Sequence, residues 1–91
     1  MADDAQRVDK WLFHARIVKT RTLAQKLVAG GHVRVNRDKV HDPARQVKIG
    51  DTLTVRRERD VIVCRIEAIA TRRGPYAEAR MLYCDPGETS R

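Results

Sequence analysis

The spacing of hydrophobic residues in the first third of the chain predicts two short amphipathic helices. The first is expected from residue 7 to residue 18, where five apolar side chains fall on one arc of about 120° of a helical wheel. These are Val8, Trp11, Leu12, Ala15 and Val18. Phe13 and Ile17 lie outside this arc, so each needs a second packing partner or an exposed role. Trp11 is expected in the core.

The second helix is bounded by residues with clear capping preferences. Thr20 is a good N-cap, because its hydroxyl can accept a hydrogen bond from the first turn. Gly30 and Gly31 then end the helix, since glycine readily takes the left-handed conformation found just past a C-terminus. The apolar stripe between these ends consists of Leu23, Ala24, Leu27 and Val28. Two short helices cannot bury both stripes alone, so a sheet is expected to cover them.

Alternating polar and apolar residues after the helices predict that sheet. Strands are expected at residues 32–36, 40–42, 52–56 and 61–66. They are separated by turns at 36–39 and 50–51 and by a charged loop at 57–60. Pro75 suits the first turn of a last short helix at 76–83. The residues of that helix expected to turn inward are Ala79, Leu82 and Tyr83.

The length and composition indicate a single small domain. Ninety-one residues leave no room for a second domain, and 42% hydrophobic against 34% charged residues allow only a thin core. We expect a flexible arm at 1–6, one domain at 7–84 and a disordered tail at 85–91. Helices and strands in separate runs predict an α+β fold, with two short helices packed on a small, strongly bent antiparallel or mixed sheet.

The positive charge is concentrated in one block of the chain. Residues 7–48 contain 11 Lys and Arg against three acidic residues, a net charge of +8, whereas the whole chain is +7. A basic field on one folded unit is typical of a protein that binds a polyanion. No apolar run approaches the roughly 20 residues of a membrane-spanning helix, and the acidic start does not resemble a signal peptide. We expect a cytoplasmic protein, and nothing demands more than a monomer.

No constellation of residues predicts catalysis, a metal or a cofactor. Ser90 is the only serine and lies in the tail, and the three histidines lack metal-ligand spacing. Cys64 and Cys84 are interpreted as two reduced thiols, because neither belongs to a CxxC pair. Gly30-Gly31 and Gly74 lack the Gly-Lys-Ser/Thr ending of a phosphate-binding loop. An enzyme is therefore not expected.

The basic residues are the remaining candidates for function. Arg21 is the strongest, because it follows the helix cap, where backbone amides favour an anion and an arginine adds a forked donor. Lys10 and Arg16 lie outside the apolar stripe of the first helix. The other basic candidates are Lys19, Lys26, Arg34, Arg37 and Lys39.

Several polar residues have a structural alternative to binding. Asp9 is interpreted as an intramolecular partner that orients Arg7 or the helix start. Asn36 either bonds its own turn or contacts a phosphate or ribose. The arginines at 56–59 are balanced by two acidic residues of the same loop, which favours simple solvation.

Together these residues resemble the RNA-binding domain first named for ribosomal protein S-four, the alpha-L motif. The pieces that carry the resemblance are Arg7-Val8-Asp9-Lys10, Thr20-Arg21, Gly31-His32-Val33-Arg34-Val35-Asn36 and Gly50-Asp51. They cover residues 7–56. Residues 11–16 and 19–21 are especially similar to the ribosome-associated heat-shock protein subgroup. Arg37 stands where the family usually has glycine, which predicts a longer or differently shaped hairpin turn.

The resemblance implies a function in RNA binding. RNA would lie across the helices and the first hairpin, without a cofactor, and the subgroup implies binding to the large ribosomal subunit and rescue of stalled translation products under stress. The residues implied to bind are Arg7, Lys10, Arg16, Lys19, Thr20, Arg21, Gln25, Lys26, Arg34, Asn36 and Arg37. Lys39 joins them from its place in the hairpin turn.

Two other functions fit part of the sequence. Two helices joined by a tight turn also describe a helix-turn-helix DNA-binding protein, with the hairpin as its wing. Against this, the second helix offers only Arg21, Gln25 and Lys26 to read bases. Alternatively, Phe13 and Ile17 beside Arg16 could form a patch that docks an acidic protein.

Overall fold

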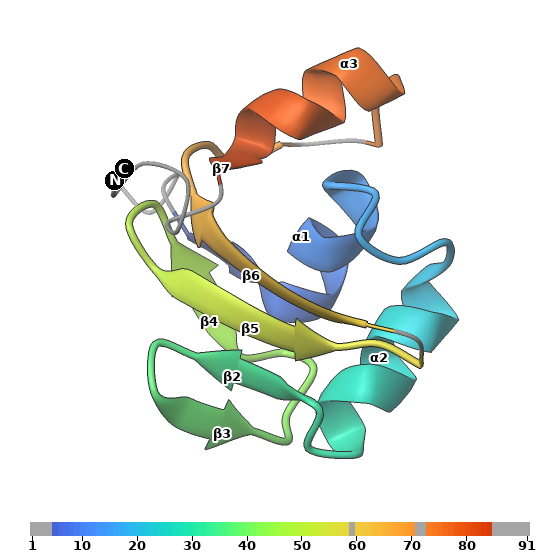
Figure 1. The fold of residues 1–91 in the computed structure, drawn as a ribbon, viewed down its shortest axis with the longest axis vertical. Coiled ribbons are helices and arrows are strands. Elements are labelled where there is room, and N and C mark those ends of the chain that lie inside the picture. The colour runs from blue at the N-terminus through green and yellow to red at the C-terminus, as the bar shows by residue number, and fades with distance from the viewer. Residues whose placement is uncertain (1–4, 59, 71–72, 85–91) are drawn as a thin grey trace.

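The strands form one five-stranded sheet and one two-stranded sheet, and every pairing is antiparallel. The computed structural model describes residues 5–58, 60–70 and 73–84 (Figure 1). The larger sheet has the order β3-β2-β5-β6-β7, with β2 (Val33–Val35), β3 (Asp38–Val40), β5 (Thr52–Arg56), β6 (Val61–Ile66) and β7 (Tyr83–Cys84). The smaller sheet pairs β1 (Ala5–Arg7) with β4 (Gln46–Lys48). The predicted α+β fold is confirmed.

The second helix has the ends that the sequence predicts. Helix α2 (Arg21–Ala29) begins after Thr20, whose Oγ1 accepts a 3.0 Å hydrogen bond from the Leu23 amide. It ends at Gly30, and the next residue, Gly31, has φ of +80°. A side chain at Gly31 would be strained in this left-handed conformation, so glycine is required there.

The first helix is shorter than predicted. Helix α1 (Val8–His14) stops four residues before the expected end at Val18, because Arg16 takes a left-handed conformation with φ of +60°. The turn that follows carries Ile17 and Val18 into the core, where each is 3% exposed. The protein-docking patch that would include Ile17 is therefore wrong. Phe13 finds its second packing partner in Arg73, whose guanidinium lies 4.7 Å from the ring centre.

The hairpin between β2 and β3 is tighter than predicted. Val35 pairs directly with Asp38, so the loop contains only two residues, Asn36 and Arg37. Asn36 takes φ of +59°, a conformation that asparagine tolerates better than most residues. Its side-chain oxygen accepts a hydrogen bond from the Thr52 amide at 3.2 Å. Arg37 does not take a positive φ, so no glycine is required at position 37. Of the longer or differently shaped turn expected from Arg37, the longer turn is wrong.

The C-terminal region differs in detail from the predicted helix. A single α-helical turn, α3 (Tyr76–Ala79), continues as a 3-10 turn, η2 (Arg80–Leu82), and the chain then enters β7. Ala79 and Leu82 are buried as predicted, and Tyr83 is half-buried with its ring edge-on to Trp11 at 6.1 Å. The tail expected at 85–91 lies outside the described residues. Of the arm expected at 1–6, Ala5 and Gln6 instead lie in β1.

The core joins α1 and α2 to the sheet. Trp11 is fully buried at its centre, with Leu12, Val28, Val33 and Leu53 around it in one cluster. Burial of these large apolar side chains is the main stabilising contribution in a domain of this size.

Hydrogen bonds from side chains to backbone carbonyls link α1 and its flanking residues to residues 67–70 and 73–74. These two parts of the chain are not joined by a common strand or helix. The indole N–H of Trp11 donates to the Ala68 carbonyl at 3.0 Å, and Nδ1 of His14 donates to the Ala70 carbonyl at 3.1 Å. Three further bonds are Gln6 to Ala70 O, Arg16 to Gly74 O and Arg73 to Phe13 O. These bonds fix the orientation of α1 on the sheet.

Acidification is expected to destabilise the fold through His14. Burial holds the pKa of His14 below its ordinary value of 6.5, and the positive charges of Lys10 and Arg21 lower it further, against the opposing effect of the Ala70 carbonyl. The unfolded chain therefore takes up the proton first, so stability is full above pH 6.5 and decreases as the pH falls through the lower folded pKa. Urea unfolding between about pH 7.5 and about pH 5 should show this decrease.

The variant His14→Gln should remove most of this pH dependence. His41→Gln is the matched control, because His41 is exposed and lies outside the bonds that hold α1. An unchanged pH dependence in His14→Gln would assign the effect to other groups.

Candidate nucleic-acid interface

A buried carboxylate organises the polar surface between α1 and α2. Asp9 is 0% exposed, and its two oxygens accept hydrogen bonds from Arg7 Nε at 3.0 Å and Arg7 Nη2 at 2.9 Å. From α2, Arg21 Nη2 approaches the same carboxylate at 3.4 Å, and Gln25 Nε2 donates to it at 3.2 Å. We call Arg7, Asp9, Arg21 and Gln25 the Asp9 cluster. Asp9 thus acts as the predicted intramolecular partner and also joins three candidate binding residues.

The surroundings of Asp9 favour the ionised form of its carboxylate. Burial alone would raise the pKa of Asp9, but hydrogen bonds from Arg7, Gln25 and the Lys10 amide outweigh burial and hold that pKa below its ordinary value. The hydrogen bond to Asp9 and its negative charge in turn raise the pKa of Arg7. Two arginines around one carboxylate leave a net charge of +1 at this surface.

The arginines of the Asp9 cluster remain available to a ligand. The side chain of Arg7 is 38% exposed and that of Arg21 is 41% exposed. Each guanidinium has five N–H donors, and Asp9 engages only two of those on Arg7. Nε of Arg21 is buried and has no partner among the described residues. Both forks are thus held by their inner edge and present their outer edge to solvent.

Two lysines extend this surface. Lys10 on α1 and Lys26 on α2 are both exposed. Lys10 and Arg21 both lie close enough to His14 for their charges to lower its pKa, which places Lys10 beside the Asp9 cluster. Lys26 lines a shallow surface groove together with Arg7 and Gln25.

The turn between the helices carries three more predicted residues. Lys19 and Thr20 are exposed beside Arg21, although the Thr20 hydroxyl already caps α2. Arg16 was expected on the first helix, but it follows the helix end and its Nε donates to the Gly74 carbonyl at 2.8 Å. Arg16 is therefore exposed at the end of α1 and braces the turn against the C-terminal region.

The hairpin residues do not share this surface. Arg34 and Lys39 are paired across β2 and β3. Val33 and Val35 point into the core with the helices, so Arg34, which alternates with them, points to the opposite face of the sheet. Arg37 and Asn36 lie at the exposed tip, where both ends of the Asn36 side chain are engaged by Asp51 and Thr52. The predicted residues therefore divide between two surfaces. One is the hairpin, and the other, which we call the helical face, consists of Arg7, Lys10, Arg21, Gln25 and Lys26.

Two arginines have structural roles that the sequence left open or missed. Arg57 donates to the Ile17 carbonyl at 2.8 Å and to both oxygens of Asp60. Arg73 stacks on Phe13 and donates to its carbonyl. The i, i+3 spacing of Arg57 and Asp60 could have indicated their pairing, whereas nothing local indicates the contacts with Ile17 or Phe13.

The exposed arginines of the Asp9 cluster have the chemistry to bind an anion. Within 5–58, 60–70 and 73–84, no group of three His, Cys, Asp or Glu side chains is placed to hold a metal ion. None of the helices in those ranges has the length and hydrophobicity needed to cross a bilayer. Oriented arginine forks suit the bidentate recognition of phosphate oxygens. The helical face is thus a candidate nucleic-acid interface.

Comparison with known proteins matches this chain to a known family. The family described as "S4 domain" matches residues 6–53. This range includes Asp9, Arg21 and the hairpin. Heat shock protein 15 of Escherichia coli K12 is 39% identical over 83 residues, 91% of this chain and 62% of that protein. Small ribosomal subunit protein uS4 of Azorhizobium caulinodans is 36% identical over 64 residues, 70% of this chain and 31% of that protein.

A solved structure supports the same relationship. The structure described as trimeric Vibrio cholerae heat shock protein 15 superposes with a TM-score of 0.85 at 37% identity. The match covers 96% of this chain and 87% of that chain. The chain spans about three fifths of the length of the curated heat shock relatives that it matches.

Proposed function

Because the chain belongs to the S4 domain family, we propose that it is a non-enzymatic protein that binds structured RNA through the helical face. The observation that carries this proposal is the Asp9 cluster, in which one buried carboxylate orients the forks of Arg7 and Arg21 toward solvent. RNA phosphates would receive these forks, and the scarcity of aromatic residues, 4% of the chain, favours phosphate and shape recognition over base stacking.

The relatives suggest where this RNA is found. Two of them are named as a heat shock protein and a ribosomal subunit protein, which supports ribosomal RNA as the ligand and a role under stress. We extend the proposal to the large ribosomal subunit and to rescue of stalled translation products in the cytoplasm. Association with ribosomal particles can be measured by co-sedimentation on gradients at low and moderate salt.

Each predicted residue has a place in this proposal. On the helical face, Arg7, Arg21 and Gln25 would form directed hydrogen bonds, while Lys10 and Lys26 add charge. The turn would contribute Arg16, Lys19 and Thr20. The hairpin residues Arg34, Asn36, Arg37 and Lys39 would reach a second segment of the RNA, since they do not share the helical face.

Arg21→Ala is expected to weaken binding to structured RNA without a preference for sequence. Five or six phosphate contacts give a slope of log affinity against log salt of roughly −4 to −5, and loss of one contact should reduce its magnitude by about 1. The side chain is 41% exposed, so the fold should lose little stability. Filter binding or fluorescence anisotropy over a salt series measures both quantities.

Arg65→Ala is the matched control, because it removes an equal charge from an exposed position on β6. If both variants lose equal affinity, binding reflects net charge and not the helical face. Equal affinity for duplex DNA of the same length would favour the helix-turn-helix alternative.

The relative of known structure is described as a trimer, so light scattering should test the monomer predicted for this chain.

A further inference from the structure

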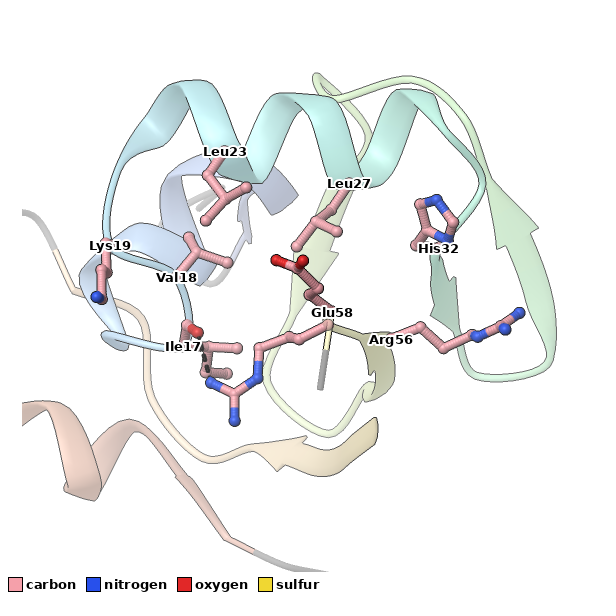
Figure 2. Close-up of a pocket in the computed structure, with 9 residues that line it drawn as sticks. Ile17, Val18, Lys19, Leu23, Leu27, His32, Arg56 and Glu58 are labelled. Carbon is pink, nitrogen blue, oxygen red and sulfur yellow. Dashed lines mark hydrogen bonds between the residues drawn. The ribbon is translucent and has the colours of Figure 1, made fainter. Parts of the chain in front are cut away.

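A second groove follows the Leu23 and Leu27 side of α2, away from Arg21 and Gln25, and among the proposed binding residues it includes Lys19. It lies between α2 and the loop that joins β5 to β6, and its volume is about 770 Å³ (Figure 2). Sites for small molecules occupy about 300–1,000 Å³, so the groove can accept a group such as a nucleoside. Its floor is apolar, formed by Val18, Leu23 and Leu27. Leu23 is 42% exposed, which is unusual for a residue of the apolar stripe of α2.

The walls of the groove are held in place by one arginine. Arg57 donates to the Ile17 carbonyl at 2.8 Å, the contact drawn as a dashed line in Figure 2, and its other donors pair with Asp60. The hydrogen bond to Asp60 raises the pKa of Arg57, so the guanidinium stays charged. The loop is thereby tied to the turn that follows α1, and the groove does not need to form when a ligand arrives.

The polar groups around the floor are of both signs. Lys19 and Arg56 are exposed at the rim, where they can receive phosphates. Figure 2 shows the Glu58 carboxylate turned toward Leu27, and no hydrogen bond or ion pair engages it among the described residues. A carboxylate repels phosphate, but it accepts hydrogen bonds from amino and ring N–H groups.

We propose that this groove binds an unpaired guanine base of the RNA held on the helical face. The base would lie on Leu23 and Leu27, and Lys19 and Arg56 would contact the flanking phosphates. Guanine presents two adjacent donors, N1–H and N2–H₂, which match the two oxygens of Glu58, whereas adenine has no donor at N1. Lys19 lines the groove and lies two residues before Arg21, so the RNA would pass from the helical face to the groove around the start of α2. This inference rests on the proposed function and adds base selectivity to it.

The selectivity can be measured with one RNA hairpin that carries a single bulged nucleotide. We expect the guanosine bulge to bind at least about fivefold more tightly than the adenosine or abasic bulge, the lower end of a bidentate base contact. Glu58→Gln should remove this guanine preference while leaving or raising the affinity for the other bulges, because it also removes a negative charge. Glu67→Gln is the matched control, since Glu67 is exposed and lies outside the groove. A uniform increase for all three RNAs in Glu58→Gln would overturn the inference.

A second experiment separates failure of the groove from failure of RNA binding. Guanosine monophosphate should shift the NMR methyl signals of Leu23, Leu27 and Val18, and Leu23→Ala should weaken this response. The inference would be overturned if these methyl signals shift with an apolar peptide or with protein concentration but not with guanosine monophosphate. If the hairpin binds through Arg21 with no dependence on the bulge, the proposed function stands and the groove assignment fails. If the nucleotide binds the groove but no hairpin binds, the proposed function fails instead.

Discussion

Asp9→Ala is expected to lower the free energy of unfolding by about 2–3 kcal/mol and to weaken RNA binding about tenfold. The substitution leaves Arg7, Arg21 and Gln25 without their shared acceptor. Loss of one partner of a fully buried ion pair costs more, but both arginines are about two fifths exposed and can be resolvated. Two unordered arginine side chains must then be fixed when RNA binds, at about 0.5–1.5 kcal/mol each. Urea unfolding and RNA titration at one temperature measure the two effects.

Asp42→Ala is the matched control for charge. Asp42 lies close enough to raise the pKa of Arg7, yet it is exposed and makes no hydrogen bond to Arg21 or Gln25. It should change RNA affinity only slightly, and in the direction of tighter binding. If Asp9→Ala also binds RNA more tightly, the carboxylate competes with phosphate and does not orient the arginines.

Trp11→Ala is expected to produce the largest loss of stability, about 3–5 kcal/mol. The residue is fully buried, its ring packs edge-on against Tyr83, and its N–H satisfies the Ala68 carbonyl. A domain of this length has a total stability of about 5–13 kcal/mol, so the loss is a large fraction of the total and the variant should unfold at a much lower urea concentration. Trp11 is the only tryptophan, so circular dichroism in place of fluorescence must follow the unfolding.

Trp11→Phe distinguishes the two contributions of the indole ring. It retains an aromatic ring against Tyr83 but loses the hydrogen bond to Ala68, and we expect a loss of about 1–2 kcal/mol. A loss as large as that of the alanine variant would mean that the hydrogen bond, and not the buried volume, stabilises this position.

Local chemistry made the element boundaries around α2 predictable. The Thr20 cap and the glycine at φ of +80° act within a few residues, so the sequence contains the whole cause. The strands at 33–35, 52–56 and 61–66 follow from alternation in the same way. The predicted α+β fold and the family resemblance both rest on such short-range patterns.

The end of α1 was not predictable, because its causes are distant. Ile17 fits no helical stripe since the chain has already left the helix, and Arg16 is braced by a carbonyl 58 positions away. The two-residue hairpin was missed for another reason. The positive φ of this turn falls on Asn36 and not on Arg37, so the absence of the family glycine at position 37 does not lengthen the turn.

The candidate site was predictable by residue but not by arrangement. Asp9 was identified as an internal partner of Arg7, two positions away, but Arg21 and Gln25 reach it from 12 and 16 positions away. Arg34 and Lys39 were expected on one RNA-binding surface across the helices and the first hairpin, and only the sheet register shows that they face away from the helices. The role of each candidate residue in RNA binding remains a prediction.

The bonds that hold α1 to residues 68, 70 and 74 have a consequence for how the protein is made. They connect positions 56 to 64 apart, so α1 is synthesised well before its partners. Contacts of such long range form late, because the intervening chain must first be closed into a loop. A nascent chain halted before residue 67 would carry every candidate RNA-binding residue but none of the contacts that orient α1. Competence to bind RNA is thus coupled to synthesis of the chain at least through residue 74.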